Sequence, residues 1–228
     1  MWAIVPLKTF SEAKQRLAEV LSESERRDLM LAMARDVLTT LSHCKRLSGV
    51  LIASRTQEAD ALAQAFSTER FSESPNADLP GTLTQASEYL QRHLGAKGVM
   101  IMPADVPMID AEEIDAILAD HDQVTLIPDR ENLGTNALIA SPADCIPFIF
   151  DGRSFRPHLD AAIAAGIKPA IVTSRNFALD IDTARDLRSL LEQAPTTQTG
   201  TFLVKSGIAQ RLEASDNVRS DGNNDSAS

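Results

Sequence analysis

One aspartate stands at the end of an apolar run, where α/β proteins bind ligands. Residues 98–102 read Gly-Val-Met-Ile-Met, which is typical of a fully buried strand, and Asp105 follows between Pro103 and Pro107. Ligands of α/β proteins bind at the carboxyl ends of parallel strands, so we interpret Asp105 as a site residue. The alternative is a turn or helix cap between two prolines.

A second acidic pair, Asp180 and Asp182, follows the apolar segment 177–179. In an extended chain alternate side chains share one side, so both carboxylates face the same way. Together with Asp105 they could hold Mg²⁺ through hard oxygen ligands, while phosphates and water complete the octahedron. This pattern predicts the chemistry of nucleotide transfer, although Asp182 could be only the N-cap of the following helix.

Cations cluster after the first predicted strand, at Lys8, Lys14 and Arg16. They could grip phosphates as side-chain charges, or Lys14 and Arg16 could be solvated helix residues. The first glycine of the chain is Gly49, which excludes a glycine-rich phosphate loop after that strand.

The composition is that of an ordinary globular protein. The chain has 228 residues and a net charge of −10, so nothing favours nucleic acid as a partner. No apolar run is long enough to cross a membrane, and no basic segment precedes the first apolar residues. We therefore expect a soluble cytoplasmic protein whose two cysteines are free thiols.

Apolar strand-like runs alternate with helical patterns along most of the chain. This alternation predicts a three-layer α/β domain over residues 1–191, with a mainly parallel sheet between helices. Residues 70–81 are expected to form a loop. The expected strands are 2–5, 49–53, 98–102, 124–127, 137–140 and 169–173, and the expected helices are 22–41, 57–66, 82–94, 157–165, 183–191 and one that begins at Asp110.

The last part of the chain divides in two. Residues 192–212 form a C-terminal extension, and its segment 201–212 is too apolar for a free tail. We expect this extension to be docked, either in the contact of a homodimer or on its own chain. Residues 213–228 are predicted to be a disordered tail, because Val218 is their only large apolar residue.

Several of these segments occur in the order found in one known family. They are Val-Pro-Leu-Lys (5–8), Ala-Lys-Gln-Arg-Leu (13–17), Pro-Ala-Asp-Val-Pro (103–107), Gly-Thr-Asn-Ala-Leu (134–138), Ser154-Phe155 with His158, and Leu-Asp-Ile-Asp-Thr (179–183). The chain resembles the 2-phospho-L-lactate guanylyltransferases and their phosphoenolpyruvate-using bacterial relatives. The resemblance implies a nucleotidyltransferase-like (glycosyltransferase-A-like) fold. It also implies transfer of GMP from GTP to the phosphate of a three-carbon acid, with release of pyrophosphate, in the biosynthesis of coenzyme F-420.

The same resemblance implies roles for individual residues. Asp105, Asp180 and Asp182 correspond to carboxylates that bind one or two Mg²⁺ ions, and Lys8 to a lysine near the substrate phosphate. Lys8, Asp105 and Asp182 are therefore the expected catalytic residues.

Other matches concern the two substrates. Thr135, Gly152 and Ser154 correspond to residues that bind the acid, although Asp151-Gly152-Arg153-Ser154 replaces the family's usual Gly-Pro-Gly-Ser. Lys14, Arg16 and Leu83 are expected to bind the nucleotide, although Gly-Thr-Leu-Thr-Gln around Leu83 replaces the usual Gly-Leu-Asn. The acid is expected to be phosphoenolpyruvate, 2-phospho-L-lactate or 3-phosphoglycerate.

Some alternatives remain open. A glycosyltransferase that uses a sugar nucleotide also carries an Asp-x-Asp metal site, and a nucleotide-binding regulator without activity belongs to another class. His158, beside Pro157 on an otherwise apolar predicted helix, is interpreted as a packed or hydrogen-bonded histidine.

Overall fold

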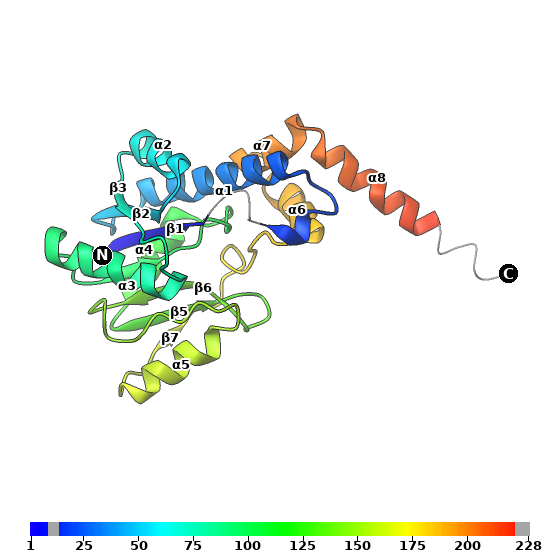
Figure 1. The fold of residues 1–228 in the computed structure, drawn as a ribbon. Coiled ribbons are helices and arrows are strands. Elements are labelled where there is room, and N and C mark those ends of the chain that lie inside the picture. Colours follow the sequence, from blue (N-terminus) through cyan, green and yellow to red (C-terminus); the bar gives the residue numbers. More distant parts are fainter. Residues whose placement is uncertain (9–13, 222–228) are drawn as a thin grey trace.

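The computed structural model describes residues 1–8 and 14–221, with side chains to residue 214. Figure 1 shows a twisted sheet with helices on both faces. The strands are β1 (Trp2–Leu7), β2 (Gly49–Ser54), β3 (Glu69–Ser72), β4 (Val99–Ile101), β5 (Val124–Pro128), β6 (Thr135–Ala140) and β7 (Ala170–Ile171). The helices are η2 (Gln15–Leu17), α1 (Glu23–His43), α2 (Gln57–Phe66), α3 (Leu79–Leu94), α4 (Ala111–Asp120), α5 (Phe155–Ala164), α6 (Ala184–Gln193), α7 (Gln198–Lys205) and α8 (Ile208–Asp221).

The seven strands form one sheet in the order β3-β2-β1-β4-β6-β5-β7. Every neighbouring pair is parallel except those that involve β6, which runs antiparallel to both β4 and β5. The mainly parallel three-layer fold expected from the sequence is therefore confirmed. Its carboxyl edge collects the ends of β1, β2 and β4, where the candidate site lies.

Two hydrophobic clusters fill the two faces of the sheet. Alternate residues of β1 face opposite sides, so Val5 packs in one cluster and Ile4 in the other. The first cluster joins the sheet to α1, α2, α4, α6 and the C-terminal helices, and the second joins it to α3 and α5. This division gives the three layers.

The segment expected to be a loop at 70–81 contains structure at both ends. Residues 69–72 form the short edge strand β3, which pairs with β2, and α3 begins at Leu79. Asp78 caps α3 by accepting the Gly81 N–H at 2.8 Å, and Pro80 fits the first turn because its missing N–H is not needed there. The strand was missed because Glu69 to Ser72 contains a single apolar residue, Phe71.

The C-terminal extension docks on its own chain. Leu203, Ile208 and Leu212 are buried in the first cluster, and α7 lies along α1 (Figure 1). Asp36 of α1 accepts the Gln198 and Thr199 N–H groups, each at 2.8 Å, which satisfies the free N-terminus of α7. Of the two arrangements left open by the sequence, these residues adopt the intramolecular one. The homodimer stays a prediction, and the buried face of the extension does not contribute to it.

Residues 213–221, which the sequence suggests are disordered, continue helix α8 to Asp221. No glycine or proline interrupts the segment before Gly222, and each added helical residue gains one backbone hydrogen bond. Residues 222–228 of the expected tail lie outside the described part of the chain. None of the described helices has the length and apolar character needed to cross a membrane, and both cysteines are free.

Candidate functional site

The two acidic segments meet at the carboxyl edge of the sheet. Asp105 follows β4, and Asp180 and Asp182 precede α6. The Ile181 N–H donates to the Asp105 carbonyl oxygen at 3.0 Å, which ties the segments together. Ile181 is fully buried, so the aspartates on either side of it face away from the core. The structure thus brings together residues that are 75 positions or more apart in the sequence.

The ammonium group of Lys14 lies between two of these carboxylates. Its Nζ is 2.7 Å from Asp105 Oδ2 and 2.6 Å from Asp182 Oδ1. The Lys14 side chain is only 7% exposed, although both carboxylates keep access to solvent. Burial alone would lower the pKa of Lys14, but the two carboxylates outweigh it and raise the pKa above its usual range. Lys14 is therefore a charged internal counter-ion.

Local backbone geometry aims Lys14 at the acids. The residue has a left-handed backbone with φ of 55° and directly precedes the short helix η2. Leu17 at the end of η2 is fully buried and anchors the segment. Arg16 lies 3.7 Å from Asp182 but is mostly exposed, so its contact is weak.

Asp180 faces the other two acids. Burial, and then the nearby Asp105 charge, raise the pKa of Asp180. Asn136 of β6 donates to Asp180 Oδ1 at 3.3 Å and to the Phe177 carbonyl at 2.8 Å. The amide therefore fixes the segment that carries the acidic pair.

These carboxylates suit Mg²⁺ chemically, but their spacing is set by Lys14. Among the described residues, no three Asp, Glu, His or Cys side chains form a group that could hold a metal ion. The ammonium of Lys14 takes the place between Asp105 and Asp182 that a cation would fill. Hard carboxylate oxygens on two tied segments are the donors that Mg²⁺ prefers. The donor set therefore fits the ion in its chemistry, while in this structure the place between Asp105 and Asp182 is held by Lys14.

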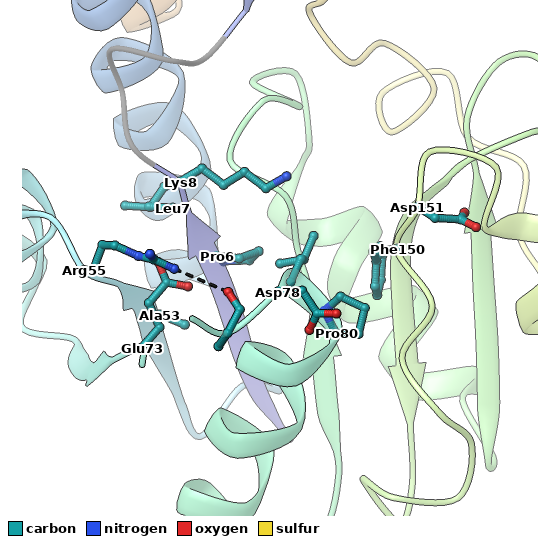
Figure 2. Close-up of a pocket in the computed structure, with 12 residues that line it drawn as sticks. Pro6, Leu7, Lys8, Ala53, Arg55, Glu73, Asp78, Pro80, Phe150 and Asp151 are labelled. Atoms are coloured by element: carbon teal, nitrogen blue, oxygen red, sulfur yellow. Dashed lines mark hydrogen bonds and ion pairs between the residues drawn. The ribbon is translucent and has the colours of Figure 1, made fainter. Parts of the chain in front are cut away.

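Two adjoining cavities open beside the acids. The larger, of about 510 Å³, lies over the ends of β1 and β2 and is shown in Figure 2. The smaller, of about 200 Å³, is lined by Asp105 and Leu83. Lys8 and Phe150 line both cavities, so together they form one path from Asp105 to the far side of β2.

Polar groups line the far end of the larger cavity. Arg55 pairs with Glu73 at 2.8 Å, and Glu73 also accepts the Thr82 hydroxyl at 2.8 Å. Asp78 uses one carboxylate oxygen as the cap of α3. Neither Arg55 nor Asp78 stands out in the sequence, because both belong to segments that only the sheet brings together.

A third cavity, of about 260 Å³, lies on the other side of the acidic pair. It is lined by Asp180 and Asp182 and by three arginines, Arg16, Arg130 and Arg185. Arg130 donates to Asp186 at 3.1 Å, and Asp186 forms a capping box with Thr183 at the start of α6. The Thr-x-x-Asp spacing of this box is visible in the sequence, whereas the position of Arg130 is not.

The residues expected to bind the acid gather around the turn before β6. Gly134 leaves room for Asp129 and for the Gly152 carbonyl, so the loop 151–154 lies beside this turn. Ser154 is buried where α5 begins, and Thr135 hydrogen-bonds His158 of α5 at 3.0 Å. Gly152 has φ of 87°, which favours glycine in the Asp151–Ser154 turn.

The expected site residues thus form two neighbouring groups at one edge of the sheet. The cavities are lined by Lys8, Arg16, Leu83 and the acids, and Lys14 lies between two of these acids. Thr135, Gly152 and Ser154 lie together at the β6 turn. In this structure Lys14 donates to two carboxylates, and its expected binding of phosphate stays a prediction.

Comparison with known proteins gives a consistent picture. The family model described as "Guanylyl transferase CofC like" matches residues 1–223. A 2-phospho-L-lactate guanylyltransferase of Methanobrevibacter smithii is 31% identical over 205 residues, with 89% of each chain covered. A phosphoenolpyruvate guanylyltransferase of Sphaerobacter thermophilus is 35% identical over 196 residues, with 85% of this chain and 93% of the relative covered.

Solved structures agree on the fold. A proposed nucleotide-diphospho-sugar transferase from Desulfovibrio desulfuricans matches with a TM-score of 0.71 at 19% identity, covering 92% of this chain and 97% of that one. A nucleotidyl transferase from Methanothermobacter matches with a TM-score of 0.61 at 15% identity, covering 84% and 95%.

Proposed function

Because the chain belongs to the CofC-like guanylyl transferase family, we propose that it transfers GMP from GTP to the phosphate of a three-carbon acid. Pyrophosphate leaves, and the product serves coenzyme F-420 biosynthesis. The acid is phosphoenolpyruvate, 2-phospho-L-lactate or 3-phosphoglycerate. The observation that carries the proposal is the meeting of Asp105, Asp180, Asp182 and Lys14 at the mouth of a cavity large enough for a nucleoside.

The reaction needs positioning more than proton transfer. A phosphate oxygen of the acid attacks the α-phosphorus of GTP, and that oxygen is already ionised at neutral pH. No general base is required, so catalysis comes from alignment and neutralisation of charge. Asp105, Asp180 and Asp182 would hold Mg²⁺, as one or two ions, and the bound metal would supply positive charge to offset that of the phosphates.

Basic side chains of the protein can neutralise the remaining negative charge of the substrate phosphates. Lys8 lies between the two cavities, where it can reach phosphate of either substrate. When Lys14 leaves the carboxylates its ammonium becomes available to the triphosphate, together with Arg16. The cavity with Arg16, Arg130 and Arg185 suits the leaving pyrophosphate.

The larger cavity supports a nucleoside subsite and the group beside Thr135 an acid subsite. A base and ribose in the cavity over β1 and β2 would direct the triphosphate past Lys8 toward Asp105. Thr135, Gly152 and Ser154 lie close to Asp151, which lines the same cavity, and an acid held by this group would approach the α-phosphorus from there.

The proposal is tested directly by product analysis. The protein is mixed with Mg²⁺, GTP and each of the three acids in turn, and pyrophosphate is measured. Pyrophosphate that appears only with one acid, together with a guanylylated product by mass spectrometry, is the expected result. A glycosyltransferase would release no pyrophosphate, and a regulator would bind GTP without turnover; either outcome rejects the proposal.

Asp78 is expected to favour GTP over ATP. A carboxylate accepts hydrogen bonds from N1–H and the 2-amino group of guanine, whereas adenine offers no donor at those positions. Asp78 lines the larger cavity, and one of its oxygens is engaged as the α3 cap. Asn caps helices as well as Asp does, so Asp78→Asn should keep the fold while reducing the GTP/ATP ratio of kcat/KM by roughly tenfold.

The control for this variant is Asp110→Asn, which makes the same change at the cap of α4. Asp110 is absent from the lining of the cavities described above, so its replacement should leave the GTP/ATP ratio unchanged. An unchanged ratio in Asp78→Asn as well would assign guanine recognition to other groups.

A further inference from the structure

His158 of α5 is buried at 0% exposure beside the proposed acid subsite. The chemistry proposed above gives it no role. Both of its ring nitrogens are engaged: Nε2 lies 2.8 Å from the Ile149 backbone nitrogen, and Nδ1 lies 3.0 Å from Thr135 Oγ1. The ring therefore connects the loop before α5 to the first residue of β6.

The first of these contacts fixes the tautomer of the ring. The Ile149 N–H can only donate, so Nε2 must be the unprotonated nitrogen. A ring that accepts at Nε2 carries its hydrogen on Nδ1, and Nδ1 must then donate to Thr135 Oγ1. In a doubly protonated ring the Nε2–H group would face the Ile149 N–H group, and neither group can accept a hydrogen bond. Burial lowers the pKa of His158 to about 4, so the ring is neutral at physiological pH.

The direction of the His158–Thr135 hydrogen bond determines where the Thr135 hydroxyl can donate. Because Oγ1 accepts from His158, the hydroxyl hydrogen of Thr135 points to another acceptor. Among the described residues His158 is the sole hydrogen-bond partner of that hydroxyl. Thr135 is buried, with 6% of its surface exposed, so a ligand rather than bulk water would have to supply that acceptor.

We infer that His158 is a positioning residue that makes the Thr135 hydroxyl a fixed donor toward an anionic oxygen of the acid. The inference rests on the proposed function, which puts the acid at Thr135. The oxygen that faces Thr135 must then be an acceptor, as carboxylate and phosphate oxygens are. If a substrate presented a donating hydroxyl group there, its hydrogen would face the hydroxyl hydrogen of Thr135 and no hydrogen bond would form.

The neighbouring structure keeps this arrangement rigid. Ala137 pairs with Ile127 and Thr135 pairs with Pro128, so Asn136 is an extra residue in β6 and re-aims Thr135. The Phe150 ring packs edge-on against His158 with centroids 4.9 Å apart, and Phe150 lines both cavities. His158 thus lies between the nucleoside path and the acid subsite.

Two substitutions distinguish a histidine that positions the Thr135 hydroxyl from one that only anchors the loop before α5. Gln at position 158 can reach the place of Nε2 and still accept from Ile149, but it loses the donor to Thr135. Asn can place its amide nitrogen near Nδ1 and keep that donor, but it loses the acceptor for Ile149. We expect His158→Gln to raise the KM for the acid by roughly tenfold with the KM for GTP unchanged, and His158→Asn to recover most of that loss.

A double-mutant cycle tests the coupling to Thr135. In a Thr135→Val background the hydroxyl is absent, so His158→Gln should have no further effect on the acid KM. His93→Gln, at an exposed histidine of α3, is the control for the general effect of the change. If His158→Asn is the more damaged variant, or if the two effects add independently, the histidine only anchors the loop and the inference is wrong.

The tautomer is also measured without any variant. In ¹⁵N-detected NMR of the wild-type protein, His158 should show a protonated Nδ1 and an unprotonated Nε2 from pH 6 to 8. The opposite tautomer overturns the inference even if both variants fail to fold. Failure of the proposed function appears differently, as absence of pyrophosphate from the wild-type protein with every acid.

Discussion

Asp105→Asn is expected to reduce guanylyl transfer by about a thousandfold or more while the melting temperature changes little. The carboxylate of Asp105 faces the cavity and is 27% exposed, so the substitution leaves the core unchanged. Asn has nearly the same shape but lacks the charge that the proposed Mg²⁺ ion needs in a ligand, while Asp182 remains as a charged partner of Lys14. Pyrophosphate release and thermal unfolding of the same preparation measure both effects.

The matched control is again Asp110→Asn, which removes a carboxylate only five residues further along the chain. Asp110 caps α4 and contacts none of the three acids through a hydrogen bond. This variant should retain full transfer activity. Unchanged turnover in Asp105→Asn would remove the carboxylate cluster from the mechanism, and a collapse of the melting temperature would make Asp105 a structural residue.

Most of the architecture was predictable because it depends on local patterns. The helix Gln57–Phe66 has the bounds expected from periodicity, and the Ser-x-x-Glu pattern at Ser22 forms a capping box in the structure. Buried strands such as Val99–Ile101 are apolar throughout, as parallel strands covered on both faces must be. The edge strand β3 escaped prediction because an edge needs few apolar residues to pair with its neighbour.

The sequence indicates which residues gather at this edge of the sheet, but it does not indicate the contacts that they make. The motifs identify Asp105 and Asp182 as carboxylates at element ends, but their partner Lys14 is 91 and 168 residues away in the sequence. The local spacing of residues does not indicate which basic side chain lies between these two carboxylates. For the same reason the sequence marks His158 only as packed or hydrogen-bonded, whereas its tautomer follows from the Ile149 and Thr135 contacts.

Lys14→Met is expected to lower stability in the absence of metal and to increase the stabilisation that Mg²⁺ provides. Without the ammonium, the carboxylates of Asp105, Asp180 and Asp182 repel one another with no counter-charge between them. Breaking a fully buried pair costs about 3–5 kcal/mol, and the partial exposure of the two partner carboxylates reduces this to about 2 kcal/mol. For a domain of this size that corresponds to a fall in Tm of roughly 4–8 °C.

Mg²⁺ should reverse that loss. In the proposed site the ion would compete with Lys14 for the same oxygens in the wild-type protein, whereas in Lys14→Met it would meet free carboxylates and bind more tightly. Binding to the folded state alone raises Tm, so the rise from a fixed Mg²⁺ concentration should be larger in the variant than in the wild type. Thermal unfolding with and without Mg²⁺ measures this, and Lys97→Met, at an exposed lysine, is the control for loss of a charge. If Lys14→Met and the wild-type protein melt at the same temperature and respond equally to Mg²⁺, Lys14 does not act as the counter-ion of these carboxylates.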